Sequence, residues 1–354
     1  MIGMFVSQTD ESKSLTQPLK IDKVYCILKK KQGETIMTYV LLIAGFAALI
    51  KGADYFVDGA SGIAKIFKIP SILIGLTIVA FGTSAPEAAV SISAAIKGNN
   101  GIALGNVIGS NIFNISVILG ITALIFPLDV QKQTMRKEIP FTLLAGVSLL
   151  ILSLDGFLKD GQSLLLDRAD GAILLLFFIV FVYYIIEAAL NSKDSQENYL
   201  PENDHETPKL GLNLLYTVGG LAAILIGGNW VVNSSIEIAT SFGISQTIIG
   251  LTIVAIGTSL PELITSVTAA RKKNTDIAIG NIVGSNIFNI FFVLGASALI
   301  SPIDIDPKLM VELFINIALT IVLLGFSRSH SKIVKWEGVV FIVLYLIYMA
   351  YLLL

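Results

Sequence analysis

Two glutamates, Glu87 and Glu262, lie within apolar segments that are long enough to cross a bilayer. Each ends a copy of one motif, GLTIVAFGTSAPE at Glu87 and GLTIVAIGTSLPE at Glu262. A carboxylate at membrane depth is costly to bury, so such residues usually line the path of a substrate. Two of them at matching positions of a repeat predict a transport site between the two halves of the chain.

A proline comes directly before each glutamate, and hydroxyl side chains lie close to both. Pro86 has no N–H group, so the helix must break or kink there, and carbonyl oxygens at mid-membrane lose their helical partners. Thr83, Glu87 and Ser91 share one helical face because they are spaced four residues apart, and Ser84 adjoins that face. The second copy repeats this arrangement with Gly257, Thr258, Ser259, Pro261, Glu262 and Ser266.

The apolar segment that follows each glutamate carries amide side chains and a further hydroxyl. It reads GNVIGSNIFN in the first copy and GNIVGSNIFN in the second. Its polar residues are Asn106, Ser110, Asn111 and Asn114, matched by Asn281, Ser285, Asn286 and Asn289. Amide oxygens can coordinate cations, and amide nitrogens can hold the opposing helix in place. Taken singly, such residues usually bond to the backbone or to a neighbouring helix.

The chemistry that this set of groups favours is the binding of hard cations. Carboxylate, hydroxyl, amide and carbonyl oxygens suit Ca²⁺ and Na⁺ far better than a soft metal. Glu87 and Glu262 repel each other in a medium of low dielectric constant unless a cation lies between them. One Ca²⁺ or about two Na⁺ would balance the pair, and competition between the two cations is the minimum requirement for an exchanger.

The composition indicates an all-α membrane protein. Hydrophobic residues make up 54% of the 354 residues and charged residues 14%, and the mean hydropathy is +0.80. Apolar runs of about 20 residues, the length of a transmembrane helix, recur along the chain. They predict ten spans near 38–57, 70–96, 102–126, 138–154, 170–190, 213–233, 244–271, 277–300, 309–326 and 338–354.

A polar connection, residues 191–210, divides the spans into five and five. We call residues 37–190 the first half and residues 211–354 the second half. The repeat extends beyond the motifs, because Asp54 and Asp58 align with Asn229 and Asn233. An odd number of spans in each half forces the halves into opposite orientations, which predicts an inverted five-helix repeat. Residues 1–36 form a polar arm that we expect to be disordered.

Loop charges predict the orientation in the cell membrane. Most lysines and arginines of the connections lie after the odd-numbered spans, and positive residues favour the cytoplasm. We therefore expect the linker between spans five and six to be cytoplasmic and the amino terminus to be outside. The lysines of the polar arm oppose this orientation. The aspartates Asp54 and Asp58 lie near a span end, which is typical of interfacial residues.

Other functions find little support in the sequence. Cys26 is the only cysteine, and the two histidines lie in polar connections, so we expect neither a disulfide nor a hydrolytic centre inside the membrane. No basic tract interleaved with aromatics indicates nucleic-acid binding. A passive channel would call for a symmetric pore of several subunits. We expect a transporter rather than an enzyme, without a cofactor, with the lipid bilayer as its surroundings and without a protein partner, and hence a monomer.

These motifs resemble the cation/Ca²⁺ exchanger superfamily, and specifically its prokaryotic sodium/calcium exchanger family. The resemblance covers residues 37–354 and implies ten helices, of which the second, third, seventh and eighth form the ion-binding core. It also implies alternating access, in which the first and sixth helices slide past the others. The ligands that it implies are Glu87, Glu262, Thr83, Thr258, Ser84, Ser259, Ser110, Ser285, Asn114, Asn289 and the backbone at Ala80 and Ala255.

The resemblance implies exchange of Na⁺ for Ca²⁺, with Ca²⁺ efflux driven by the Na⁺ gradient. Relatives carry an aspartate at the position of Asn289, so coupling to K⁺ remains an alternative. A proton-coupled relative would carry an acidic residue after the Gly-Asn pair, and Val107–Ser110 and Ile282–Ser285 contain none. Ca²⁺/H⁺ exchange is therefore a disfavoured alternative.

Overall fold

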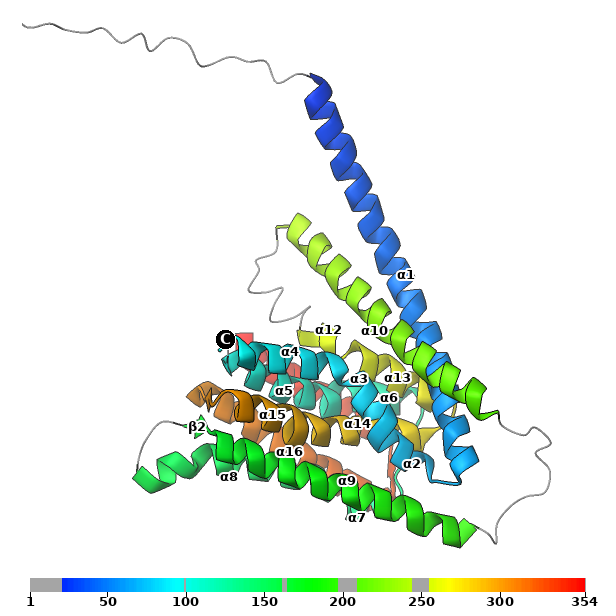
Figure 1. Ribbon diagram of the computed structural model, residues 1–354, viewed down its shortest axis with the longest axis vertical. Coiled ribbons are helices and arrows are strands. Elements are labelled where there is room, and N and C mark those ends of the chain that lie inside the picture. Colours follow the sequence, from blue (N-terminus) through cyan, green and yellow to red (C-terminus); the bar gives the residue numbers. More distant parts are fainter. Residues whose placement is uncertain (1–20, 99, 161–163, 197–208, 244–254, 354) are drawn as a thin grey trace, which may run out of the picture.

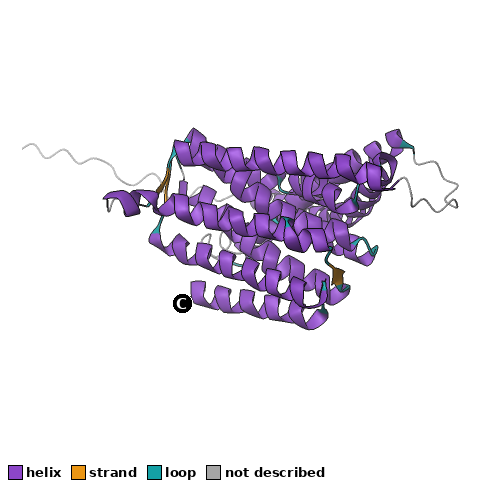
Figure 2. Ribbon diagram, turned by 90° about the horizontal axis from the view of Figure 1, so that it is seen from below, coloured by secondary structure: helices purple, strands orange, loops and turns teal. Residues whose placement is uncertain are grey.

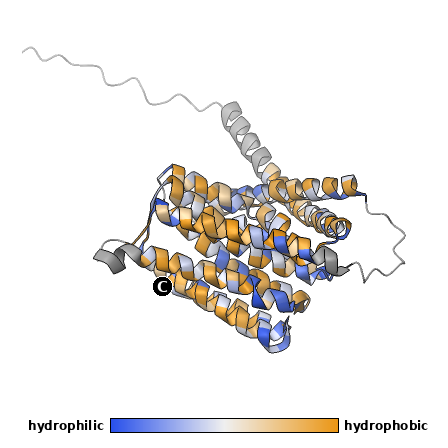
Figure 3. Ribbon diagram, turned by 60° about the horizontal axis from the view of Figure 1, so that its bottom comes forward, coloured by the Kyte–Doolittle hydropathy of each residue, from blue (hydrophilic) through white to orange (hydrophobic). Residues whose placement is uncertain are grey.

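The structure is a computed structural model that describes residues 21–98, 100–160, 164–196, 209–243 and 255–353. Helices make up nearly all of these residues, as the composition predicts, and the strands are four segments of two residues each. Apolar residues cover most of the helices (Figure 3), which is the pattern of a protein surrounded by lipid.

Two long helices, α1 (Ile21–Phe67) and α10 (Leu210–Ser241), lie side by side and are inclined to the other helices (Figure 1). Glycines allow their backbones to approach closely. A methyl group on Gly52 would lie 2.9 Å from the carbonyl oxygen of Gly220. The first helices of the two halves therefore form a closely packed pair.

The polar arm differs in part from the expectation of disorder. Residues 1–20 lie outside the described residues, whereas residues 21–36 continue α1 without a break. This stretch has no proline, and the run Leu28–Gln32 at its centre consists of residues that favour helices, so the first span can extend through it.

The predicted break before each glutamate is present. The first glutamate segment consists of α2 (Ser71–Ile74), the π-helical η1 (Gly75–Val79), α3 (Ala80–Thr83) and α4 (Ala85–Ile96). The segments before and after Ser84 are bent by 50°, because Pro86 cannot continue the hydrogen-bonding pattern. The second segment has the same break between α12 (Ala255–Thr258) and α13 (Leu260–Arg271).

The segments that carry the asparagines are continuous helical spans that contain π-helical turns. The first consists of α5 (Asn100–Phe113), η2 (Asn114–Ile118) and α6 (Leu119–Ile125). The second consists of α14 (Thr275–Ile287), η4 (Phe288–Leu294) and α15 (Gly295–Ile300). Such turns are frequent at functional sites. They place Asn114 and Asn289 where the helical pattern changes.

The core of the fold depends on a close contact between η1 and α14. A methyl group on Gly75 would lie 3.0 Å from the Cα atom of Gly280, so glycine at both positions lets the two backbones touch. This contact brings the first broken segment directly against the asparagine-bearing segment of the second half.

The remaining helices enclose this core. They are α7 (Lys132–Arg136), α8 (Glu138–Asp160), α9 (Arg168–Gln196), α16 (Pro307–His330) and α17 (Lys335–Leu353). Seen from below, the helices of the molecule lie in rows stacked on one another (Figure 2).

Short antiparallel strand pairs join the two halves at their loops. β1 (Leu128–Asp129) pairs with β4 (Lys332–Ile333), and β2 (Leu165–Leu166) pairs with β3 (Ile303–Asp304). The first pair also carries an ion pair of 2.9 Å between Lys332 and Asp129. Each pair takes one strand from each half, so the halves are tied together outside the helical core.

Eight described helices are long and apolar enough to cross a membrane, and the bent pair around Ser84 makes a ninth. They match nine of the ten predicted spans in position. The seventh predicted span, 244–271, is described only from residue 255 onward. The number of ten spans and their inverted arrangement therefore stay predictions.

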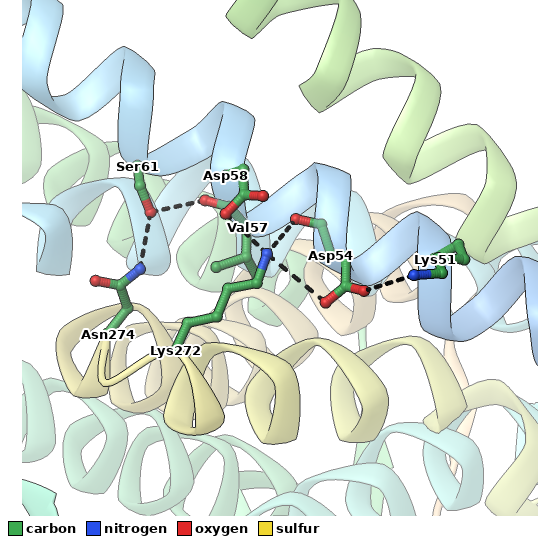
Figure 4. A network of polar contacts seen from close by, with 7 residues as sticks. All are labelled: Lys51, Asp54, Val57, Asp58, Ser61, Lys272 and Asn274. Atoms are coloured by element: carbon green, nitrogen blue, oxygen red, sulfur yellow. Dashed lines mark hydrogen bonds and ion pairs between the residues drawn. The ribbon is translucent and has the colours of Figure 1, made fainter.

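One lysine connects the helix pair to the core (Figure 4). Lys272, at the end of α13, lies 2.7 Å from Asp58 and 3.6 Å from Asp54 of α1, and it also donates to the carbonyl oxygen of Asp54 at 2.7 Å. One turn away, Asn274 donates to Ser61 at 3.1 Å. The two aspartates, which the sequence marks as interfacial, thus fasten α1 to α13.

Candidate cation site

The broken segments and the asparagine segments meet at the centre of the described residues. α4 packs against α5, and α13 packs against α14. Both glutamates are 1% exposed, although a carboxylate without partners is among the costliest groups to bury. The site is therefore defined by what surrounds these two side chains.

Glu87 is held by hydroxyls from the second half. The hydroxyl of Ser259 lies 3.1 Å from Oε1 of Glu87, and Thr258 also bonds to this carboxylate. Ser259 lies 3.2 Å from the hydroxyl of Ser110, which comes from α5. Three helical segments thus converge on one carboxylate.

Glu262 is held in the same way by the first half. The hydroxyl of Ser84 donates to Oε1 of Glu262 at 2.8 Å, and Thr83 bonds to the same carboxylate. The hydroxyl oxygen of Thr83 also lies 3.0 Å from Oδ1 of Asn281. Ser84 and Ser259, the residues at the two breaks, leave the helical conformation. The φ and ψ angles are −82° and 9° at Ser84 and −90° and 7° at Ser259, and this conformation lets each side chain make its contact.

The two glutamates therefore exchange partners between the halves. Each receives its hydroxyl bonds from the Thr-Ser pair of the other half. The sequence brings these residue types together, but it does not show this crossed pairing.

Asn106 and Asn281 bond to the backbone carbonyl groups of the two glutamates. The amide of Asn106 donates to the carbonyl oxygen of Glu87 at 3.3 Å and to Ser91 at 2.9 Å. Asn281 makes the matching bonds to Glu262 and Ser266 at 3.3 Å and 2.9 Å. These amides hold the helical turn that bears each glutamate, and their nitrogens point at protein groups.

Several buried oxygens of the site have no hydrogen-bond partner among the described residues. They are Oε2 of Glu87, Oε2 of Glu262, Oδ1 of Asn114, Oδ1 of Asn289 and the hydroxyl oxygen of Ser285. A buried acceptor without a partner costs about 1–3 kcal/mol. Five such oxygens, given by both halves, have the donor chemistry of a hard-cation site.

The two backbone positions differ in what can be said of them. The carbonyl oxygen of Ala80 accepts the N–H of Ser84 at 3.0 Å and the hydroxyl of Thr83 at 3.3 Å. Ala255 is the first described residue after the gap at 244–254, and the residues before it lie outside the described part. The assignment of both as ligands stays a prediction.

In the described part of the chain, no group of three or more His, Cys, Asp or Glu side chains could hold a metal ion. The candidate ligands are instead two carboxylates with neutral hydroxyl and amide oxygens. Such a set discriminates by size and charge among hard cations.

Comparison with known proteins gives a consistent result. A family model described as sodium/calcium exchanger protein matches residues 37–187 and 212–354. Inner membrane protein YrbG of Escherichia coli (strain K12) is 39% identical over 276 residues, which are 77% of this chain and 82% of the relative. Sodium/calcium exchanger MaX1 of Methanosarcina acetivorans is 35% identical over 344 residues, which are 89% of this chain and 98% of the relative. A solved structure of the sodium-calcium exchanger NCX_Mj, soaked with zero Na⁺ and Ca²⁺, aligns with a TM-score of 0.77 and 32% identity, covering 90% of this chain and 99% of that chain.

Proposed function

Because the chain belongs to the sodium/calcium exchanger family, we propose that it is a secondary antiporter that exchanges Na⁺ for Ca²⁺ across a membrane. The transported ions are its substrates, and the proposal includes no resident cofactor and no catalytic reaction. In the cell, Na⁺ entering down its gradient would drive Ca²⁺ out.

The unpartnered oxygens around Glu87 and Glu262 carry this proposal. Two buried carboxylates have a combined charge of −2, which one Ca²⁺ or about two Na⁺ would balance. Binding of one kind of ion therefore leaves no charge in the site to balance the other kind. Mutual exclusion of this kind couples the two fluxes. The ligands that we propose are Glu87, Glu262, Thr83, Thr258, Ser84, Ser259, Ser110, Ser285, Asn114, Asn289 and the carbonyl groups of Ala80 and Ala255.

The transport cycle that we propose depends on how the two halves are arranged in the membrane. We propose ten spans in two inverted five-helix repeats, 37–190 and 211–354, joined by a cytoplasmic linker, with the amino terminus outside the cell membrane. Movement of the α1–α10 pair along the core would open the site to one side at a time. The glycine contact between these two helices supports their movement as one unit.

A flux assay on the purified chain tests the proposal. Proteoliposomes loaded with Na⁺ and diluted into Na⁺-free medium should take up ⁴⁵Ca²⁺, and an ionophore that dissipates the Na⁺ gradient should stop the uptake. Repeating the uptake by Na⁺-loaded vesicles with and without K⁺ in the outer medium tests K⁺-dependent exchange, and vesicles with a pH gradient alone test Ca²⁺/H⁺ exchange. Uptake that ignores the Na⁺ gradient would remove the proposed coupling, and uptake that continues without any gradient would indicate a channel.

A further inference from the structure

We propose that Asn111 and Asn286 are positioning residues that orient the two ion-facing amides, each acting on the opposite half of the chain. The inference rests on the proposed cation site, in which Asn114 and Asn289 are ligands. It assigns a role to the two asparagines of the repeated GSN sequence, which do not themselves present an unpartnered oxygen to the site.

Each positioning residue accepts a hydrogen bond from one ion-facing amide. The side-chain nitrogen of Asn289 donates to Oδ1 of Asn111 at 3.1 Å. The side-chain nitrogen of Asn114 donates to Oδ1 of Asn286 at 3.0 Å. Both bonds cross from one half to the other, as the hydroxyl bonds to the glutamates do.

A second pair of bonds prevents the positioning amides from turning over. Asn111 donates its side-chain nitrogen to the carbonyl oxygen of Asn286 at 3.2 Å, and Asn286 donates to the carbonyl oxygen of Asn111 at 3.5 Å. If the amide of Asn111 were reversed, its nitrogen would face the nitrogen of Asn289 and its oxygen would face a carbonyl oxygen. Both contacts would be repulsive.

The direction of these bonds determines which end of each ligand amide faces the ion. The side-chain nitrogens of Asn114 and Asn289 donate to the positioning residues. The side-chain oxygens of Asn114 and Asn289 are left without a partner among the described residues. All four asparagines are buried, with at most 1% exposed, so solvent does not compete for these groups. Without the positioning residues, a buried amide could present its N–H₂ group, which would repel a cation.

The same geometry specifies what can serve as a ligand at these two positions. The group must donate a hydrogen bond to a fixed acceptor and keep one oxygen for the ion. A neutral amide does both, whereas an ionised carboxylate at position 289 would set one of its oxygens against Oδ1 of Asn111. The network therefore holds neutral ligands there and leaves the charge of the site to the two glutamates.

Double-mutant cycles on the full chain test the proposal, with the KM for Ca²⁺ in Na⁺-loaded proteoliposomes as the readout. Asn111→Ala should raise this KM by about tenfold while the maximal rate changes little, because the ligand amide loses its orientation but the glutamates remain. Adding Asn111→Ala to Asn289→Ala should change the KM by no more than about twofold, since the positioning residue acts through the ligand.

Matched pairs make the cycle specific. Asn286 with Asn114 should show the same coupling as Asn111 with Asn289, whereas the non-bonded pairs Asn111 with Asn114 and Asn286 with Asn289 should be less coupled. Equal coupling in all four pairs, or additive effects in the two bonded pairs, would overturn the proposal. A structural role alone would lower the melting temperature and would not distinguish bonded from non-bonded pairs.

Folding and function are separated by two further measurements. If Asn111 and Asn286 variants fail to fold while Asn114 and Asn289 variants fold, the pair is structural and the proposal is overturned. If the wild-type chain takes up no Ca²⁺ in exchange for Na⁺, the proposed function fails, and the cycle is then run on Ca²⁺ binding by calorimetry, where the same pattern of coupling is expected.

Discussion

The hydroxyl of Ser84 lies 2.8 Å from Oε1 of Glu262, so a residue of the first half holds the carboxylate of the second. The matching contact joins Ser259 to Glu87 at 3.1 Å. Neither half can form its part of the site alone. Any movement that separates the halves near these residues would break both contacts together. The two hydrogen bonds should therefore differ between conformations of the transporter.

Neutralising either glutamate should abolish exchange. Glu87→Gln and Glu262→Gln each remove one of the two charges that balance Ca²⁺, and we expect Na⁺-driven ⁴⁵Ca²⁺ uptake to fall by about a hundredfold or more. Glu187→Gln, which alters an exposed glutamate of α9, is the control and should transport normally. Wild-type flux in either site variant would exclude these carboxylates as ligands.

Removing a crossed hydroxyl should weaken Ca²⁺ binding without abolishing transport. Ser84→Ala deletes the bond to Glu262, and we expect a KM for Ca²⁺ about tenfold higher. Ser259→Ala should have a similar effect through Glu87. Ser93→Ala, on the exposed face of α4, should leave the KM unchanged. If both site variants match that control, the hydroxyls do not contribute to the site.

An acid at position 289 should change ion competition more than folding. Asn289→Asp adds a third acidic group beside two glutamates, so we expect the Na⁺ concentration that halves Ca²⁺ uptake to shift by at least about threefold. The melting temperature should fall only modestly, because the side chains are nearly equal in size and the change costs one hydrogen bond, the one to Oδ1 of Asn111. An unchanged Na⁺ dependence would argue against a central place for this residue.

The contact between Gly75 and Gly280 should tolerate no side chain. A methyl group on Gly280 would lie 2.7 Å from the carbonyl oxygen of Ile72, so Gly280→Ala should destabilise the protein by about 1–3 kcal/mol through steric overlap. Gly325→Ala serves as the control, because a methyl group there meets no described atom within 4 Å. Thermal unfolding in detergent measures both, and equal melting temperatures would contradict this packing.

The ion pairs of Lys272 should contribute modestly to stability. Lys272→Gln removes bonds to Asp54 and Asp58, and because these groups are partly exposed we expect a loss of about 1 kcal/mol or less. The loss should shrink in high salt. Exchanging the charges with Asp58→Lys and Lys272→Asp should restore part of it. An effect that is independent of salt would show that packing, not charge, is responsible.

The repeated motifs predicted the main features of the site, because they depend on local chemistry. Pro86 and Pro261 break their helices wherever the segments lie, and apolar length indicates a span without any knowledge of its neighbours. The breaks, the burial of both glutamates and most span positions could therefore be predicted from the sequence.

What could not be predicted depends on contacts between distant residues. No local pattern indicates that Ser84 bonds to Glu262 instead of Glu87, or that Asn111 accepts from Asn289. Two-residue strands are too short to leave a periodic signal. Asp54 and Asp58 are ordinary span-end residues by position, and only the packing of α1 on α13 gives them a common partner in Lys272.

Among the described residues, the ion pairs of Lys272 with Asp54 and Asp58 have no counterpart at the matching positions of the repeat. Lys97 occupies the position that matches Lys272, yet the residues aligned with the two aspartates are Asn229 and Asn233, which bond to each other at 3.0 Å. Neutral amides cannot replace the aspartates as ionic partners. The repeat therefore reproduces the positions of these residues but not their charges, so added salt should weaken the contact between α1 and Lys272 and have no matching effect on the amide pair of α10.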